Sequence, residues 1–189
     1  RDLVVCLACR DPLKGGLART RILAQMPWAQ VEVFRLDLSS FASIRQFVDA
    51  FEAQHGAVDI LVNNAATVPI RRQFTHEGFE MQFGVNYLGH FMLTHLMLPM
   101  LQRSVELRGE ARIVHVTSLT HVLGRIDDRS FRGESAYKAG AAYAQSKLAN
   151  LLFHHALSRR LPMGVSSLAM HPGSVASQIW REVPKWLYA

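Results

Sequence analysis

Short apolar runs alternate with longer amphipathic segments along this chain, and this alternation limits its fold more than any other feature. The short runs are typical of buried strands: LVVCLAC (3–9), VEVFRLDL (31–38), DILVNNA (59–65), ARIVHVTS (111–118) and VSSLAMHPG (165–173). The longer segments predict helices at 13–26, 41–56, 75–103 and 139–161. Strands that alternate with helices predict an α/β fold, a doubly wound parallel sheet with helices on both faces and right-handed crossovers.

The segment 41–56 shows the helical pattern most clearly. Its apolar stripe consists of Ile44, Phe47, Val48 and Phe51. Ser39 or Ser40 stands where a helix N-cap is expected, and Gly56 stands where a left-handed C-cap is expected. We therefore expect this helix to begin just after the serines and to end at the glycine.

Composition and charge narrow the class of protein. A chain of 189 residues that is 49% hydrophobic and 19% charged suits one globular domain with a sizeable core. The longest apolar stretch, residues 91–101, is interrupted by His95 and Pro99 and is far shorter than the roughly 20 residues of a membrane span. The net charge of +6 comes from scattered arginines. This favours a solvated basic surface that can attract an anionic cofactor, and we expect no nucleic-acid partner.

Cys6 and Cys9 form the pattern C-x-x-C, which in other contexts indicates a redox or metal site. Residues three apart on a strand point to opposite faces, so this pair can neither close a disulfide nor hold one ion. We therefore predict no metal site from the motif. Two cysteines without a disulfide partner fit a reducing compartment.

Polar residues and one glycine occupy the carboxyl ends of the predicted strands, the edge at which parallel sheets bind ligands. They are Arg10, Asp37, Asn63, Asn64, Ser118, His171 and Gly173. A second signal lies in AAYAQSKLANLLF, where Tyr143 and Lys147 are four apart and share one helix face. Packing alone would favour two apolar residues there. An ammonium group beside a phenol indicates instead a phenol that is made easier to deprotonate.

Five local patterns in order resemble the short-chain dehydrogenases/reductases. They are LACR (7–10), LDL (36–38), NNA (63–65), VTS (116–118) with YAQSK (143–147), and HPGSV (171–175). The stretches GVNYLGHFMLTHLMLP (84–99), SLTHVLGRI (118–126) and SKLANLLF (146–153) are similar to the retinol-dehydrogenase branch. The resemblance implies a Rossmann-like sheet and an oxidoreductase that uses a nicotinamide cofactor.

The resemblance also implies catalytic roles. Tyr143 would exchange a proton with the substrate oxygen, and Lys147 with the positive nicotinamide ring would favour its phenolate over the ordinary phenol, whose pKa is near 10. Lys147 would also hold the ribose hydroxyls. Ser118 would hydrogen-bond the substrate oxygen, and Asn86 would hold a water that joins Lys147 to solvent; the competing interpretation of Asn86 is a polar residue on a wet helix face. We interpret Tyr137 as a tyrosine of the substrate loop or the surface.

Cofactor choice follows from the end of the first strand. By resemblance Arg10 suits a 2′-phosphate, so NADP(H) is preferred, while the adjacent Asp11 keeps NAD(H) as an alternative. The cofactor-binding residues that the resemblance implies are Arg10, Asp37, Leu38, Asn64, Ala65, Ala66, Tyr143, Lys147, Pro172, Gly173, Ser174, Val175 and Ser177. Asp37 would meet the adenine amino group, residues 64–65 the adenine ribose, residues 172–175 the nicotinamide, and Ser177 the carboxamide.

Two departures from the family pattern stand out. Ala66 replaces a glycine in N-N-A-G, and no G-x-x-x-G-x-G phosphate loop occurs in the chain. The resemblance therefore implies an incomplete fold in which residues 1–189 are a partial NAD(P)-binding domain, with the first strand and phosphate loop missing. The strands at 3–9 and 31–38 would lose their central neighbour. Either the sheet has a gap, or the strand at 3–9 shifts to pair with that at 59–63.

The function that the resemblance implies is the interconversion of a small lipophilic alcohol, retinoid-like or otherwise hydrophobic, and its carbonyl. A non-catalytic, truncated Rossmann-like interaction module is the alternative. Family members pair through helices equivalent to 81–101 and 139–161, so the apolar stripe on 81–101 is interpreted as a core face or a homodimer face. Membrane attachment is expected only through segments outside this chain, and a cytoplasmic or membrane-associated location inside the cell stays open.

Overall fold

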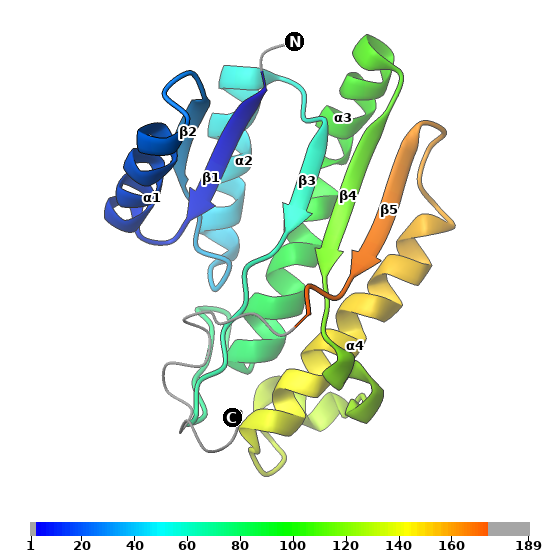
Figure 1. The fold of residues 1–189 in the computed structure, drawn as a ribbon. Coiled ribbons are helices and arrows are strands. Elements are labelled where there is room, and N and C mark those ends of the chain that lie inside the picture. Colours follow the sequence, from blue (N-terminus) through cyan, green and yellow to red (C-terminus); the bar gives the residue numbers. More distant parts are fainter. Residues whose placement is uncertain (1–2, 174–189) are drawn as a thin grey trace.

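The computed structural model describes residues 3–173 and contains two parallel sheets (Figure 1). The strands are β1 (Val4–Cys9), β2 (Gln30–Arg35), β3 (Ile60–Asn63), β4 (Ala111–Val116) and β5 (Val165–Met170). The main helices are α1 (Pro12–Gln25), α2 (Phe41–His55), α3 (His90–Arg108) and α4 (Ala139–Ser158). A π-helical segment, η1 (Phe83–Gly89), precedes α3, and two 3₁₀ turns, η2 (Leu119–Leu123) and η3 (Asp128–Arg132), interrupt the loop before α4. The predicted α/β class and parallel pairing are confirmed.

The strands form one pair and one triplet rather than a continuous sheet. β1 pairs with β2 over six residues, and β4 lies between β3 and β5. Among the described residues no strand pairing joins β1 to β3, and the two strands face each other across a gap in Figure 1. The predicted gap is therefore found, and the alternative pairing of strand 3–9 with strand 59–63 was wrong. The prediction that the strand 31–38 also borders the gap was wrong. β2 pairs with β1 after the crossover through α1, so the strands on the two sides of the gap are β1 and β3.

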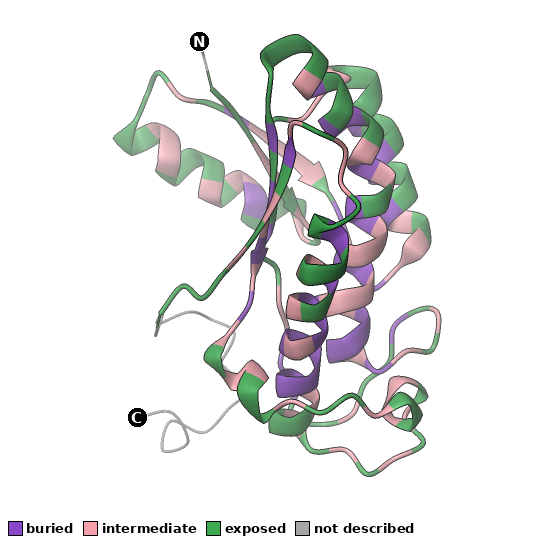
Figure 2. Cartoon of the chain, turned by 90° about the vertical axis from the view of Figure 1, so that its right-hand side faces the viewer, coloured by how far each residue is buried: buried purple, intermediate pink, exposed green. Residues whose placement is uncertain are grey.

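The helices form two unequal layers (Figures 1 and 2). α1 covers β1 and β2 on one face, and it buries only Gly15. α2, α3 and α4 cover the other face, where the core lies. The opposite face of the triplet is largely exposed, with apolar side chains at Ile60, Val62, Leu168 and Met170. Apolar burial therefore stabilises mainly the side of α2, α3 and α4.

α2 follows the sequence prediction closely. Its four predicted apolar residues are all buried in the core. The Ser40 hydroxyl accepts a hydrogen bond from the amide of Ser43, and Gly56 adopts a left-handed conformation with φ of 68°. The helix thus begins and ends at the residues that the caps indicated.

The predicted helix at 75–103 starts later and ends later than expected. Thr75 belongs to a tight turn, and the helical segment begins at residue 81 and continues to Arg108. The buried Glu80 carboxylate caps it, accepting hydrogen bonds from the amides of Gln82 and Phe83, both at 2.9 Å. The apolar stripe on this helix is a core face, since Leu93, Met97, Met100 and Leu101 are buried. Among the described helices, none is both long and apolar enough to cross a bilayer.

Candidate active site

The polar residues expected at one edge of the sheet lie beyond the carboxyl ends of the strands, as parallel pairing requires. Arg10 follows β1, Asp37 lies just beyond β2, Asn64 follows β3, and Ser118 lies two residues after β4. His171 to Gly173 follow β5. Asn63 differs from these, because its buried side chain donates to the Thr94 hydroxyl at 2.8 Å and points into the layer of α3. It contributes to packing rather than to the edge.

Tyr143, Lys147 and Ser118 meet at the end of β4. Tyr143 and Lys147 lie on the buried side of α4, and the Lys147 ammonium nitrogen is 5.6 Å from the Tyr143 ring centre. Lys147 Nζ donates a hydrogen bond to the carbonyl of Val116 at 2.8 Å. Ser118 forms a side-chain hydrogen bond with Tyr143 and also accepts from the Thr120 hydroxyl at 3.0 Å. The structure therefore brings together three of the four predicted catalytic side chains.

Burial displaces the pKa of both helix residues toward their neutral forms. It lowers the pKa of Lys147 to about 8, and it raises the pKa of Tyr143 above its ordinary value. The hydrogen bond from Ser118 opposes the rise in the pKa of Tyr143 but does not cancel it. The lowering of the Tyr143 pKa that the resemblance implies was expected from Lys147 together with a positive nicotinamide ring, whereas in the protein without cofactor burial raises this pKa. The phenol is protonated at neutral pH.

Asn86 is fully buried within η1, which excludes a place on a wet helix face. Its side-chain oxygen accepts from the amide of Thr67 at 2.8 Å, and its side-chain nitrogen donates to the Thr67 carbonyl and to the Ser146 hydroxyl, both at 3.1 Å. Ser146 in turn donates to the Tyr143 carbonyl at 2.8 Å. Asn86 therefore connects the segment after β3 to α4 next to Tyr143. Ser146 is buried and links Asn86 to the backbone of α4.

No pattern in the sequence pointed to the residues that hold the loop between β4 and α4. The Tyr137 hydroxyl donates to the Pro69 carbonyl and accepts from the Gln82 side chain at 3.0 Å. The Arg72 guanidinium donates to the carbonyls of Gly133 and Ser135. Tyr137 is thus a loop residue, as predicted, but it has a supporting role. These contacts join the loop to the N-cap of η1 and to the segment after β3.

The residues expected near the adenosine half of a cofactor differ in their exposure and in their hydrogen bonds within the chain. Arg10 is exposed at the end of β1. Asp11 caps α1, and its carboxylate accepts from the amide of Leu13 at 3.0 Å. One carboxylate oxygen of Asp37 accepts from the amide and hydroxyl of Ser39 at 2.9 and 2.7 Å. Leu38 is buried in the core.

Leu38 also lies against η1. A Cβ on Gly89 would come within 2.6 Å of the Leu38 carbonyl, so only glycine allows this approach. Asn64 and Ala65 are exposed beyond β3, and Ala66 is half-buried. Pro172 and Gly173 are exposed after β5. Ser174, Val175 and Ser177 lie outside the described residues.

Cys6 and Cys9 occupy opposite faces of β1, as their spacing predicted. The Cys6 thiol lies 3.8 Å from the ring of His55 in α2, whereas a Cβ on Gly15 in α1 would meet the Cys9 sulfur. Both thiols are free.

Comparison with known proteins identifies the family. The short chain dehydrogenase family model matches residues 16–187. Human retinol dehydrogenase 11 is 45% identical over 191 aligned positions, which cover 100% of this chain and 59% of that protein. Zebrafish polyprenol dehydrogenase is 38% identical, covering 95% of this chain and 56% of that protein.

A crystal structure of a putative uncharacterized protein from Mycobacterium paratuberculosis is also similar. It shares 38% identity and superposes with a TM-score of 0.78 over 95% of this chain and 62% of that one. The chain thus spans a little more than half the length of the curated relatives that it matches. The family model and these identities show that the chain belongs to the short-chain dehydrogenase family, and it resembles the retinol dehydrogenases of that family.

Proposed function

We propose that the protein is an NADP(H)-dependent oxidoreductase that interconverts a lipophilic alcohol and its carbonyl. The observation that carries this proposal is the convergence of Tyr143, Lys147 and Ser118 at the carboxyl end of β4. A phenol that is hydrogen-bonded to a serine and backed by a buried lysine is suited to move a proton at a substrate oxygen. The names of the retinol and polyprenol dehydrogenases support a lipophilic substrate.

The residues play distinct roles in this reaction. Ser118 orients the substrate oxygen toward Tyr143, and Tyr143 gives or takes the proton at that oxygen. The protonated phenol is the form that reduction of a carbonyl needs, whereas oxidation of an alcohol needs the phenolate. Lys147 supplies positive charge behind the phenol. Asn86 positions α4 through Ser146, so its role is to hold the catalytic helix. A bound nicotinamide cofactor would supply or accept the hydride.

The residues present fit such a cofactor at the edge of the sheet. Exposed Arg10 can pair with a 2′-phosphate in a bidentate manner. Asp11 does not compete for that region, because its carboxylate caps α1. This difference favours NADP(H) over NAD(H). Asn64 and Ala65 would meet the adenine ribose, Lys147 the nicotinamide ribose, and Pro172 with Gly173 the nicotinamide.

The partial domain and its partners are part of the same proposal. Residues 1–189 supply the catalytic helix and most of the cofactor edge, without a glycine-rich phosphate loop. We expect a homodimer through α3 and α4, on the side of Leu152, whose side chain is exposed on α4. The substrate is a small molecule.

The decisive experiment replaces Tyr143 by Phe in the full-length protein and measures turnover of retinal and of aliphatic carbonyls with NADPH and NADH. A general acid/base group contributes about 10² to 10⁴ in rate, so the variant should keep less than about a tenth of the activity. Its affinity for NADPH should hardly change. Ser118→Ala should lower kcat in the same way but less. Tyr87→Phe is the matched control, because the Tyr87 hydroxyl makes no hydrogen bond with the described residues.

Two results would contradict the proposal. If Tyr143→Phe keeps more than about a tenth of the activity, the tyrosine is not the acid/base group. If the wild-type protein turns over none of the carbonyls with either cofactor, the alternative of a non-catalytic interaction module gains support.

A further inference from the structure

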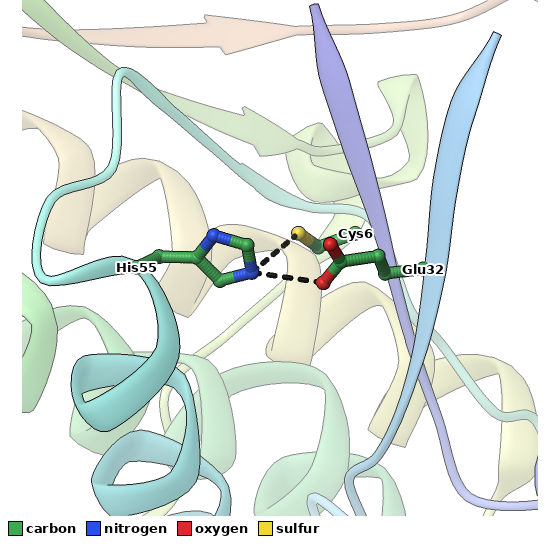
Figure 3. A group of neighbouring side chains, drawn as sticks. All are labelled: Cys6, Glu32 and His55. Atoms are coloured by element: carbon green, nitrogen blue, oxygen red, sulfur yellow. Dashed lines mark hydrogen bonds and ion pairs between the residues drawn. The ribbon is translucent and has the colours of Figure 1, made fainter.

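Three side chains with different metal-binding atoms meet away from the catalytic edge (Figure 3). Cys6 comes from β1, Glu32 from β2, and His55 from the last turn of α2. His55 Nε2 lies 2.9 Å from a Glu32 carboxylate oxygen and 3.8 Å from the Cys6 sulfur. The three ligand atoms all lie within 4.8 Å of one another.

The fold explains why these residues meet. Cys6 and Glu32 are direct partners in the parallel register of β1 and β2, so their side chains leave the same face of the sheet. α2 packs on that face and brings His55 over them. The His55 ring lies 4.8 Å from the Phe51 ring and 5.9 Å from the Phe34 ring, centre to centre. Two aromatic neighbours therefore restrict its orientation.

The two distances from His55 Nε2 are close to those between ligands of a tetrahedral zinc ion. Zinc lies at about 2.3 Å from sulfur and about 2.0–2.2 Å from nitrogen or oxygen, which puts tetrahedral S–N and N–O pairs at about 3.6 and 3.3 Å. The observed 3.8 and 2.9 Å differ from these values by a few tenths of an ångström. Small rotations of the side chains would close that difference.

The donor set also selects the metal. A thiolate, an imidazole and a carboxylate together suit zinc, whereas magnesium and calcium prefer oxygen ligands alone. The Gln54 side chain donates to the same Glu32 oxygen at 2.8 Å, which is the kind of outer contact that orients a metal-binding carboxylate. The side chains of His55 and Glu32 are 20% and 35% exposed, so water can reach a fourth coordination position.

We propose that Cys6, Glu32 and His55 form a zinc site that ties α2 to the β1–β2 pair. Zinc displaces the thiol proton of Cys6 to solvent, binds neutral His55 and the Glu32 carboxylate, and completes its tetrahedron with water. Cys6 and Glu32 lie in the first half of their strands, and His55 ends a helix that runs back from the carboxyl edge. The site thus stands apart from Tyr143 and Lys147. Its role is structural, since it ties the last turn of α2 to the β1–β2 pair, which among the described residues has no strand pairing with the β3–β4–β5 triplet.

The test is a calorimetric titration of the metal-free full-length protein with Zn²⁺. The zinc content of the protein is then measured after gel filtration. We expect one zinc ion per chain and a higher unfolding temperature in its presence. Loss even of an outer contact lowers metal affinity by about 10- to 100-fold, so Cys6→Ser and His55→Gln should each weaken zinc binding by about 100-fold or more. Cys9→Ser is the matched control, because Cys9 faces α1, and it should bind zinc as the wild type does.

A second measurement needs no variant of the site. Zinc should slow alkylation of Cys6 in the wild-type protein and leave alkylation of Cys9 unchanged, as mass spectrometry of the two peptides would show. In the Co²⁺-loaded protein, a thiolate-to-cobalt charge-transfer band should be present, and it should be absent in Cys6→Ser. The proposal is overturned if the wild type binds no zinc, if Cys6→Ser binds it as tightly as Cys9→Ser, or if zinc protects neither cysteine.

Discussion

Replacement of Lys147 by Met should make the protein more stable at neutral pH while it destroys the proposed activity. Lys147 is 2% exposed, and burial lowers its pKa from 10.5 to about 8. A change of one in a pKa corresponds to about 1.4 kcal/mol, so keeping the buried ammonium charged costs the folded state about 3 kcal/mol. Methionine has a similar length without the charge, so it removes this penalty.

The loss of one hydrogen bond reduces the expected gain. The variant lacks the bond from Lys147 Nζ to the Val116 carbonyl, and a bond to a charged group contributes about 1.5–3 kcal/mol. We therefore expect a net gain of about 1 kcal/mol at pH 7 in urea-induced unfolding of the cofactor-free full-length protein. Lys138→Met is the control, because Lys138 is exposed at the start of the same helix and should change stability by less than about 0.5 kcal/mol.

The pH dependence tests the cause of the gain. The folded pKa lies below the unfolded one, so the unfolded chain binds more protons at this lysine and wild-type stability rises with pH between about 8 and 10.5. The free energy of unfolding of the Met variant minus that of the wild type should be largest below pH 8 and should decrease between pH 8 and 10.5. Subtraction cancels the groups that titrate there at a distance from Lys147. A difference that stays flat between pH 8 and 10.5 would refute the reasoning, and so would a variant that is clearly less stable at pH 7.

Three other perturbations follow from the described contacts. Asn86→Ala leaves three hydrogen-bonding groups without the Asn86 side chain as partner. It should lower the free energy of unfolding, measured in urea, by about 2–5 kcal/mol. A decrease as small as that of a surface substitution would contradict the role of Asn86 in linking the segment after β3 to α4. Arg10→Asp should weaken binding of NADPH and not of NADH in a fluorescence titration, and an unchanged ratio would make Arg10 a surface residue only. Residues 1–189 expressed alone should unfold at low temperature, and NADPH should not raise their unfolding temperature. No glycine-rich loop is present to bind the pyrophosphate, and β1 and β3 are not paired across the gap. A cooperative unfolding transition whose temperature rises with NADPH would show that this loop is dispensable.

The positions along the sheet edge could be predicted because they depend on order alone. Once the strands are parallel, their carboxyl ends must share one edge, so Arg10, Asn64 and Ser118 are placed without knowledge of side-chain packing. The spacing of Tyr143 and Lys147 likewise needs only the helical repeat. Opposite faces for Cys6 and Cys9 follow from the strand repeat in the same way.

Features that depend on contacts distant in sequence could not be predicted. Thr75 and Glu80 are both suited to cap a helix, and Glu80 is the cap in the structure because its buried carboxylate meets two free amides. The π-helical turn around Asn86 is hidden in a segment that is apolar on most sides. The Cys6–Glu32–His55 cluster could not be predicted from C-x-x-C, because it joins residues of two strands and a helix. The feature that reveals this cluster is the strand register, which places Cys6 directly opposite Glu32.

The electrostatics of the site indicate what the proposed nicotinamide cofactor would add to it. Burial disfavours an ammonium on Lys147 and a phenolate on Tyr143 separately, yet the two charges together form a neutral pair. The Val116 carbonyl and the Ser118 hydroxyl each stabilise one member, and neither offsets burial fully. A further positive charge next to the phenol would favour the phenolate, and an oxidised nicotinamide carries such a charge. Since burial raises the pKa of Tyr143, the proposed oxidation of an alcohol would depend more strongly than the proposed reduction of a carbonyl on positive charge beyond that of the described residues.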